Sequence, residues 1–576
     1  MKEKQKEWTI IIYMAGDNNL AVDMAYAMEQ IKGVAAAGPY SPNLFVYYDG
    51  NSPDIPTLYC DFSELENPRY VRSFKVPNKL LKVPKKTNEN AANWRSIVNF
   101  VDWCVNKVQV DHDDGEVTFG RRANRYALIF AGHSLGFQDI GLFKDETSGK
   151  SMKMDEFGQV LRILTANPDQ FEQLVRDNEP DEETGELPKY LLGQKLDILG
   201  FDSCVMGMLE VGYQFEQVTE TIIASEGSVP SAGWTYAKIL GCLAQEKGNK
   251  LKTKELAELF VNQFVRSQDA FTVGGVSVDM AAWDLSRFRP LVDAFDGLSE
   301  ALTFCFAEED RIYRQMERII LKVHWQCQSY MFDQNVDLGD FCELLDRECG
   351  LVADELGEGE DVETFRLIQD HCKNVNIQLR NAVILSGFSG PGYQYSNGIS
   401  VFFPWSREGY EVSKKNYESL WFVKDMEQKK LSWTGFLQTY LYKVSRRELG
   451  DLVVDVPLGA KYRYPSGVKF SEGFGLVTSG SAVQRTKIAG QENTRIAGQE
   501  NTRIAGQENT RIAGQENTRI AGQENTRIAG QENTRIAGGG GSGGFFNSLQ
   551  LFKNVAKRWD ISGFTKRPPE TNFGDD

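Results

Sequence analysis

The sequence is poor in histidine and lacks the cysteine spacing of a disulfide framework or a zinc site. Only four of its 576 residues are histidines, so few imidazoles are available for acid–base chemistry: they are His112, His133, His324 and His371. The nine cysteines are odd in number and include no C-x-x-C pair, which argues against a disulfide-stapled secreted domain and against zinc binding. Such cysteines fit a reducing compartment, and we predict a cytoplasmic protein without a metal site.

The chain also lacks a long apolar run and an excess of positive charge. The N-terminal run from Trp8 to Met14 stops at a polar turn, and no segment approaches the roughly 20 apolar residues needed to span a bilayer. The formal charge is −16, from 64 basic and 80 acidic residues, which disfavours nucleic acids and anionic membranes as partners. We therefore predict no membrane span and no nucleic-acid partner.

Apolar, β-branched runs alternate with segments of helical periodicity in the first half of the chain. The hydrophobic content of 41% and the aromatic content of 11% are ample for a packed core. This alternation predicts an α/β fold with a mostly parallel, doubly wound sheet. The predicted strands are 8–14, 44–48, 126–131, 196–201 and 221–224, and the predicted helices include 20–31, 94–108 and 154–164.

One predicted strand ends in a cysteine. The apolar run 196–201 stops at Asp202-Ser203-Cys204, and residues 205–215 place apolar side chains at helical spacing. Because ligand sites lie at the carboxyl ends of parallel strands, we expect the Cys204 thiol to face solvent beside a helix N-terminus. The partial positive charge of that terminus favours thiolate. The alternative is a buried structural cysteine.

A second predicted strand ends in a histidine. The run 126–131 leads into Gly132-His133-Ser134, upstream of Cys204 in the chain. An imidazole within hydrogen-bond reach of a thiol can take its proton and later donate one to a leaving amine, which is the chemistry of cysteine peptidases. A histidine satisfied within the core is the alternative, although the glycines around His133 favour a loop tip.

Five segments, taken together and in order, resemble the clostripain-like cysteine peptidases, which share a clan with caspases, gingipains and legumain. The segments are WTIIIYMAGDNNL, ALIFAGH, LDILGFDSCVMG, ASEGSVPSAGW and GISVFFPW, and the resemblance covers most of Trp8 to about Trp405. It implies a caspase-like, mostly parallel sheet flanked by helices. It also implies a His133/Cys204 dyad and endopeptidase activity after Arg or Lys.

The resemblance further implies the substrate-binding residues. Asp202 matches the acid at the base of the pocket for the basic side chain, and a carboxylate there selects Arg by bidentate geometry. Ala232 stands where the family usually has a second acid, which weakens the attraction for a cation. Ser134 stands where glycine is common, and its backbone N–H and that of Cys204 would form the oxyanion hole. We predict no cofactor, and a dependence on calcium stays open.

A serine hydrolase is the main alternative interpretation of the sequence. Gly132-His133-Ser134-Leu135-Gly136 is a literal G-x-S-x-G, the nucleophile elbow of α/β-hydrolases. Ser134 would then be the nucleophile, with His324 or His371 as the base. An elbow is followed at once by a helix, whereas residues 137–149 are rich in turn formers and predict a hairpin. Both of those histidines also lie in helical stretches.

The segment between His133 and Cys204 contains a polar, proline-bounded loop at 179–189 of the kind that proteases cut. In the resembling family a zymogen is often cut between the two catalytic segments. Lys144, Lys150 and Lys189 are therefore candidate cleavage sites, although each is also an ordinary exposed lysine.

Composition divides the chain into four parts. We predict a peptidase domain at 1–300, a second α+β domain at 301–475, a repeat-containing linker at 476–544 and an amphipathic segment at 545–576. The linker holds period-eight TRIAGQEN repeats, each with one large apolar residue, which cannot bury a core. A flexible tail is the expected state, and a stacked β-solenoid filled by the isoleucines is the alternative.

The linker repeats a basic residue in a constant T-[KR]-I-A context. For an Arg/Lys endopeptidase these would be self-cleavage sites, whereas an inert spacer is the competing interpretation. The basic residues are Lys487, Arg495, Arg503, Arg511, Arg519, Arg527 and Arg535.

The segment beyond the linker places Phe545, Leu549, Phe552 and Trp559 on one helical stripe near basic residues. We expect this segment to dock on the acidic body of its own chain, and a partner-docking or membrane-surface helix is the alternative. The whole sequence predicts a self-processing cysteine endopeptidase whose substrates are proteins or peptides with a basic residue before the cut. A catalytically inactive scaffold that presents the repeat and tail is the alternative from another class.

Overall fold

The fold is known from a computed structural model of the whole chain. The structure describes residues 6–34, 41–64, 68–76, 79–84, 86–107, 121–138, 142–178, 187–245, 248–268, 277–307, 311–330, 334–426 and 432–445. His112, residues 179–186, the repeat linker with its seven basic residues and the segment 545–576 lie outside the described residues.

The central feature is a sheet of nine described strands in the order β13-β10-β9-β8-β5-β1-β2-β3-β4. The strands from β9 to β2 are parallel, whereas the outer strands on both sides are antiparallel. The strands are β1 (Lys6–Gly16), β2 (Asn43–Gly50), β3 (Leu58–Asp61), β4 (Arg69–Arg72), β5 (Ala123–Ala131), β8 (Leu196–Asp202), β9 (Thr219–Ala224), β10 (Val278–Asp284) and β13 (Val383–Ser389).

The sheet forms because its central strands are apolar on both faces. In β1 the residues from Trp8 to Gly16 are all buried, and every residue of β8 is buried as well. A continuous apolar run of this kind is stable only where helices cover both faces of the sheet. The predicted strands 8–14, 44–48, 126–131, 196–201 and 221–224 all lie within described strands.

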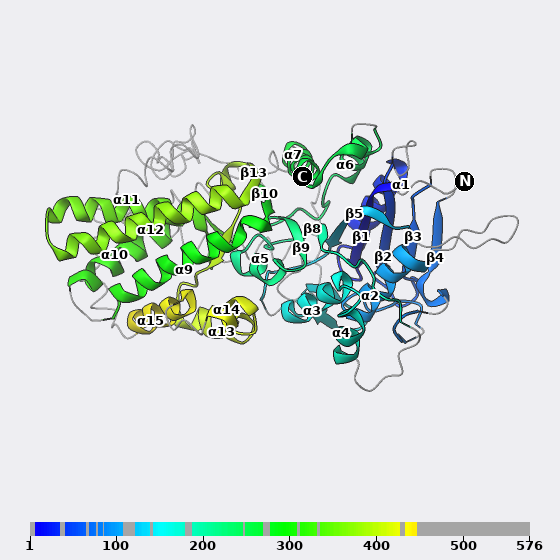
Figure 1. Cartoon of the computed structure of the whole chain (residues 1–576), viewed down its shortest axis with the longest axis horizontal. Helices are drawn as coiled ribbons and strands as arrows, with labels where there is room; N and C mark the ends of the chain where they lie inside the picture. Colours follow the sequence, from blue (N-terminus) through cyan, green and yellow to red (C-terminus); the bar gives the residue numbers. More distant parts are fainter. Residues whose placement is uncertain are drawn as a thin grey trace, which may run out of the picture.

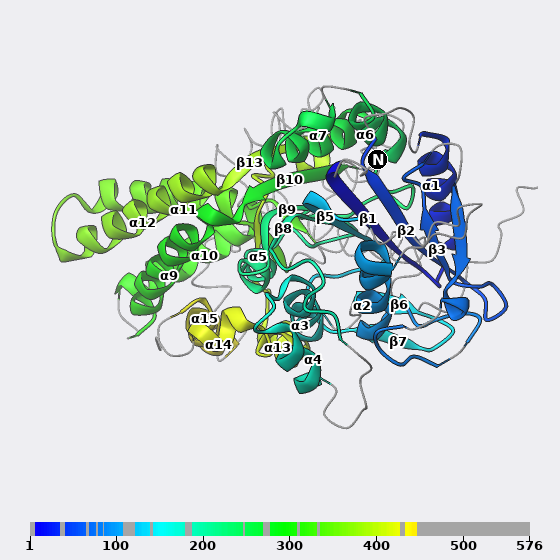
Figure 2. The same cartoon turned by 45° about the vertical axis from the view of Figure 1, so that its right-hand side comes forward.

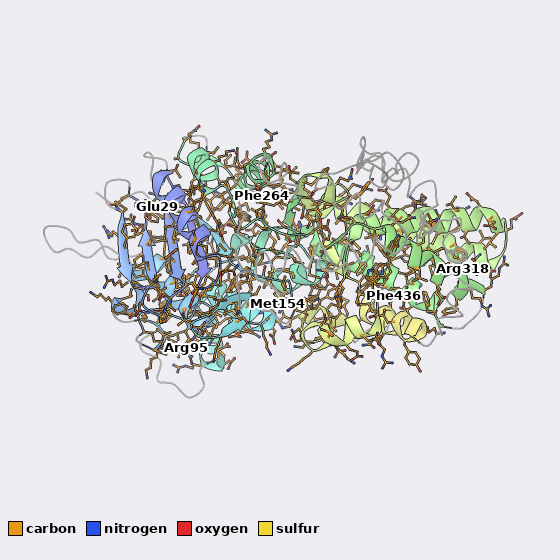
Figure 3. All side chains as sticks on the ribbon, turned by 180° about the vertical axis from the view of Figure 1, so that it is seen from behind. Glu29, Arg95, Met154, Phe264, Arg318 and Phe436 are labelled. Carbon is orange, nitrogen blue, oxygen red and sulfur yellow. The ribbon has the colours of Figure 1, made fainter. Side chains whose placement is uncertain are left out.

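Helices cover both faces of the sheet (Figure 1). α1, α6 and α7 lie on one side, and α2, α3, α4 and α5 lie on the other. Figure 3 shows Phe264 of α7 and Met154 of α3 on these opposite sides. The bounds are α1 (Ala21–Val34), α2 (Trp94–Asp102), α3 (Met154–Thr165), α4 (Phe171–Asn178), α5 (Leu209–Phe215), α6 (Tyr236–Leu243) and α7 (Thr253–Arg266).

The later part of the chain extends the molecule away from the sheet as a group of long helices (Figure 1). A small sheet of β11 (Ser329–Tyr330), β12 (Asn335–Asp337) and β14 (Ser400–Phe402) lies in this part. The helices are α9 (Phe288–Cys305), α10 (Arg311–Gln326), α11 (Leu338–Leu356), α12 (Glu360–Ala382), α13 (Arg407–Tyr417), α14 (Trp421–Met426) and α15 (Trp433–Ser445). β13 returns to the main sheet beside β10.

The predicted α/β fold, with a mostly parallel sheet flanked by helices, is confirmed. The domain boundaries stay a prediction, and the one at 300/301 falls inside α9. No described helix is both long enough and apolar enough to cross a bilayer.

A hairpin follows the His133 segment, as the turn-rich composition of residues 137–149 predicts. It consists of β6 (Leu142–Asp145) and β7 (Lys150–Met152). Figure 2 shows it near the end of β1 that is furthest from the N-terminus. There the Asn18 side-chain amide donates to the carbonyl oxygen of Lys144 at 3.0 Å.

Candidate active site

The ends of two neighbouring parallel strands form the core of the site. β5 and β8 pair up to Ala131 and Asp202, and the Gly132 N–H donates to the Asp202 carbonyl oxygen at 3.4 Å. His133 and Cys204 follow directly, so they leave the sheet at the same edge. The prediction that both side chains come from neighbouring strand ends therefore agrees with the observed register.

One pocket is lined by both candidate catalytic residues and by Asp202. Its walls come from the end of β1, from α1, from the two strand ends and from the loop after β9. The remaining lining residues are Met14, Leu20, Asp23, Met24, Ala27, Ala131, Gly132, Ser203, Val229, Pro230, Ser231, Ala232, Gly233 and Tyr236.

Cys204 differs from the prediction in its surroundings. Its side chain is 7% exposed, and α5 begins only at Leu209, so the thiol is not at a helix N-terminus. Burial raises the pKa of the Cys204 thiol to about 11, which favours the neutral thiol. The expectations of a solvent-facing cysteine and of thiolate stabilised by a helix are therefore wrong for this conformation.

The predicted helical segment 205–215 starts late because its first residues bind the loop after β9. Val205 has a positive φ of 58°, its N–H donates to the Gly227 carbonyl at 2.9 Å, and the Gly207 N–H donates to Ser225 at 2.8 Å. A Cβ on Gly207 would lie 2.6 Å from the Glu226 nitrogen, so only glycine permits this approach. Tertiary pairing overrides the helical pattern here.

The same loop covers the thiol. The Val229 N–H donates to the Cys204 sulfur at 3.4 Å, and the sulfur lies 3.7 Å from the Val229 carbonyl oxygen. These contacts fix the thiol against the Val229 backbone, in the wall of the pocket that His133 also lines.

His133 is 6% exposed and is held by a residue that sequence reasoning missed. Its Nε2 lies 2.7 Å from Oδ1 of Asn19. Burial, with a smaller contribution from Lys144, lowers the pKa of His133 to about 4, so the ring is neutral at neutral pH. Asn19 follows β1, and the same strand-end argument that selects His133 could have selected it.

The two oxygens of the Asp202 carboxylate differ in their hydrogen bonds. Oδ2 accepts hydrogen bonds from the Trp234 N–H at 3.1 Å and from the Tyr236 hydroxyl at 2.8 Å. Oδ1 is buried and has no hydrogen-bond partner among the described residues. Burial raises the pKa of Asp202 to about 6, so the group is ionised at neutral pH. A buried, unpaired carboxylate oxygen in a pocket wall is suited to a cationic ligand.

The pocket lining contains a second acid besides Asp202. Ala232 lies in the pocket lining, at the position that the sequence resemblance assigns to it. Asp23, on α1, also lines the pocket, and its carboxylate accepts a hydrogen bond from the Ser231 side chain. Burial raises the pKa of Asp23. Sequence analysis missed Asp23, because only the packing of α1 against this edge brings it to the pocket.

Ser134 does not line the pocket. It is 2% exposed, and its hydroxyl donates to the Cys204 carbonyl oxygen at 2.6 Å. His324 is buried in α10 between the rings of Phe403 and Trp405, at centroid distances of 4.0 and 3.9 Å. Neither His324 nor His371 lines the pocket, so the structure does not assemble the triad that the serine-hydrolase reading requires.

Two of the candidate cleavage lysines are accessible. Lys150, in β7, and Lys189, in the loop before β8, are exposed, whereas Lys144 in β6 is partly buried. Lys144 also forms an ion pair with Glu146 at 3.5 Å. Lys150 and Lys189 are thus the stronger candidates within the described residues.

Comparisons with known proteins identify the family of this chain. The clostripain family profile matches residues 12–439, which is most of the chain. Clostripain from Hathewaya histolytica is 21% identical over 450 residues, covering 70% of this chain and 76% of that protein. The fold and the family match together define a cysteine-type endopeptidase. The chain belongs to the clostripain family.

Solved structures of C11 proteases are also similar. An inactive zymogen from Parabacteroides distasonis is 15% identical, with a TM-score of 0.46, covering 74% of this chain and 99% of that one. A secreted C11 cysteine protease from Bacteroides thetaiotaomicron is 13% identical, with a TM-score of 0.45, covering 76% of this chain and all of that one.

Proposed function

We propose that this peptidase cleaves proteins or peptides after Arg or Lys, with Cys204 as the nucleophile and His133 as the general base and acid. The proposal is supported by the pocket that both side chains line. The observation that carries the specificity is the buried Oδ1 of Asp202 in the same pocket, which has no partner in the part of the chain that the structure describes. A guanidinium or ammonium group would supply the missing partner.

The pKa values favour a neutral resting pair. The Cys204 thiol has a pKa of about 11 and His133 a pKa of about 4, so between these values neither group is charged. His133 takes the thiol proton as the sulfur attacks the scissile carbonyl carbon. The C–S bond forms while the carbonyl π bond opens to an oxyanion. His133 then protonates the leaving amine, and water hydrolyses the thioester to release acid and thiol.

Backbone N–H groups of Ser134 and Cys204 would stabilise the oxyanion. Among the described residues, no backbone carbonyl accepts from either N–H. Cys204 lines the pocket whereas Ser134 does not, so the role of the Ser134 N–H rests on the family resemblance. A donor of this kind contributes ~2.7–4 kcal/mol to transition-state stabilisation.

Asp23 compensates in part for the alanine at position 232. Two carboxylates in one pocket attract a cationic side chain more strongly than Asp202 alone. We assign Asp202 the contact with the basic side chain, made through Oδ1 because Oδ2 already accepts two hydrogen bonds. Asp23 has an electrostatic role on the α1 wall, and both Arg and Lys side chains can supply the positive charge.

Self-processing is the second part of the proposal. Lys150 and Lys189 are exposed between the catalytic segments. A cut there would separate the part of the chain that carries His133 from the part that carries Cys204. The linker residues Lys487 to Arg535 offer further cuts that would free the segment 545–576.

Hydrolysis of matched peptides tests the assignment. Peptides with Arg, Lys, citrulline or Gln before the cut would be given to wild-type protein and to the Cys204→Ala, His133→Ala and Ser134→Ala variants. We expect cleavage after Arg and Lys only, with activity lost in the Cys204 and His133 variants and kept in Ser134→Ala. Loss in Ser134→Ala alone would support the serine-hydrolase alternative, and no cleavage in wild type would support the scaffold alternative.

Two acid variants test the specificity. Asp202→Asn should abolish the preference of Arg over citrulline, and Asp23→Asn should raise KM for both basic peptides with a smaller effect on kcat. Asp169→Asn, which removes an exposed acid outside the pocket, is the control. An unchanged Arg/citrulline ratio in Asp202→Asn would refute the assignment.

Intact-mass measurement tests self-processing. Wild-type protein should lose mass at Lys150 or Lys189 and at the linker sites, while Cys204→Ala remains whole. A wild-type preparation that cleaves peptides but keeps its full mass would contradict the self-processing proposal and leave the peptidase assignment standing.

A further inference from the structure

Tyr236 lines the substrate pocket and contacts the proposed specificity acid directly. It is the first residue of α6, which packs beside α1 (Figure 1). The residue is 1% exposed, and its hydroxyl donates to Asp202 Oδ2 at 2.8 Å. Nothing in the sequence singles this tyrosine out, because Asp202 ends β8 and lies 34 residues earlier in the chain.

The protein holds the two oxygens of Asp202 unequally. Oδ2 accepts from the Trp234 N–H at 3.1 Å and from the Tyr236 hydroxyl, whereas Oδ1 has no partner among the described residues. The donor of Trp234 belongs to the backbone and does not depend on its side chain. The Tyr236 hydroxyl is therefore the side-chain group that makes the two oxygens different.

Both donors favour the ionised carboxylate. Burial disfavours the charge and raises the pKa of Asp202 to about 6, while the hydrogen bonds from Trp234 and Tyr236 act in the opposite direction. Burial also raises the pKa of the Tyr236 hydroxyl well above its usual range, so this group stays a neutral donor at neutral pH. Without the hydroxyl, Asp202 would keep its proton to a higher pH.

We propose that Tyr236 is a positioning residue for substrate specificity: its hydroxyl binds Oδ2 of Asp202 and so leaves Oδ1 as the acceptor for the basic side chain of a substrate. The inference rests on the proposed cleavage after Arg or Lys. A carboxylate with one oxygen fixed by the protein presents the other at a defined place, which a carboxylate free to rotate does not. Tyr236 thus acts through Asp202.

The other titratable side chains of the pocket lining can be separated from Asp202. They are Asp23, His133 and Cys204. The pKa of His133 is lowered by burial to about 4, below the range in which Asp202 titrates, and Cys204 is replaced in the binding experiment. Asp23 on the α1 wall also attracts a cation, but its contribution is common to variants at Asp202 and Tyr236.

Peptide binding to the full chain carrying Cys204→Ala tests the inference without cleavage. A peptide with Arg before the scissile bond, and its uncharged citrulline counterpart of nearly the same shape, would be titrated by calorimetry at a series of pH values. In this parent we expect the Kd of the Arg peptide to rise as the pH falls through about 6. The Kd of the citrulline peptide should stay nearly constant.

Tyr236→Phe should change the pH dependence for the Arg peptide alone. Phenylalanine keeps the buried ring and removes only the hydroxyl. We expect the midpoint for the Arg peptide to move upward by about one pH unit, and the preference for Arg over citrulline at neutral pH to fall. When Asp202→Asn is already present, Tyr236→Phe should not change the ratio of the two Kd values further, because both changes act on one contact.

Tyr213→Phe is the matched control. The Tyr213 hydroxyl donates to Asp425 Oδ2 at 2.8 Å, and the residue is 5% exposed. The variant therefore loses the same kind of hydrogen bond from a buried ring, but outside the pocket. It should leave both Kd values and the midpoint unchanged.

Three results would overturn the inference and leave the proposed specificity standing. They are an unchanged midpoint in Tyr236→Phe, an equal loss of affinity for both peptides, and a midpoint shift of the same size in Tyr213→Phe. The second result would mean that Tyr236 has a structural role only. A parent that binds the Arg and citrulline peptides equally at every pH would instead overturn the proposed specificity, and this inference with it.

Discussion

The Ser134 hydroxyl donates a hydrogen bond to the Cys204 carbonyl oxygen over 2.6 Å, so the loops that carry the proposed base and nucleophile are joined directly. Both residues are buried, and a hydrogen bond in the low-dielectric interior is stronger than one in water. The serine that looks like a nucleophile in the sequence therefore acts as a brace between two strand ends.

Removing this brace should weaken catalysis without abolishing it. Ser134→Ala deletes one hydrogen bond, worth about 0.5–1.5 kcal/mol, and we expect kcat/KM to fall by up to about tenfold. Ser148→Ala is the control, because the Ser148 hydroxyl has no hydrogen-bond partner among the residues that the structure describes. A loss as complete as that of Cys204→Ala would contradict a bracing role.

The pH profile should depend on the substrate. Burial raises the pKa of Asp202 to about 6, so the carboxylate becomes protonated as the pH falls below 6 and loses its attraction for a cation. We expect kcat/KM for Arg peptides to fall through this range. In Asp202→Asn the fall in kcat/KM near pH 6 should disappear. The remaining fall in kcat/KM should lie near pH 4, where His133 becomes protonated. If kcat/KM of Asp202→Asn for Arg peptides still falls near pH 6, Asp202 is not the group that attracts the basic side chain.

Gly233 has no room for a side chain at the base of the pocket. Its φ is +66°, and a Cβ there would lie 2.7 Å from Asp202 Oδ2. Gly233→Ala should cost about 1 kcal/mol in stability and reduce kcat/KM for Arg peptides more than tenfold. Gly241→Ala is the control: nothing lies within 4 Å of its Cβ position in α6, and helix propensity predicts slight stabilisation. Equal kcat/KM for Arg peptides in Gly233→Ala and Gly241→Ala would contradict the close approach of Gly233 to Asp202.

Stability should fall as the pH rises through the range in which buried carboxyls ionise. Glu210 is fully buried, and burial raises its pKa from 4.5 to about 7. Between those values the folded state keeps a proton that the unfolded state has lost, so the free energy of unfolding decreases from about pH 4.5 to pH 7.

Glu210→Gln should flatten this dependence. The amide keeps an acceptor for the Phe402 N–H, at 2.9 Å from Glu210 Oε1 in wild type, and cannot ionise. We expect the drop in Tm between pH 5 and pH 8 to shrink, corresponding to a free-energy change of roughly 2–3 kcal/mol. The exposed variant Asp169→Asn should show the same dependence of Tm on pH as wild type. A steeper fall of Tm with pH in Glu210→Gln would contradict the expected direction of the effect.

Local pattern was sufficient for much of the architecture. The apolar runs of β1, β2, β5 and β8 specify buried strands by themselves, because such runs are stable only inside a covered sheet. The end of each run fixes where His133, Cys204 and Asp202 stand along the chain. Parallel strands place those ends at one edge, so the candidate site follows from the order of motifs.

Contacts between segments that are far apart in the sequence were decided only by the tertiary structure. The burial of the thiol depends on Val229, and the missing helical turn at Val205 depends on pairing with the loop after β9. Asp23 reaches the pocket through the packing of α1. The hydrogen bond from Tyr236 to Asp202 joins the start of α6 to the end of β8. Burial and charge proximity are properties of three-dimensional neighbours, and periodicity in one segment does not contain them.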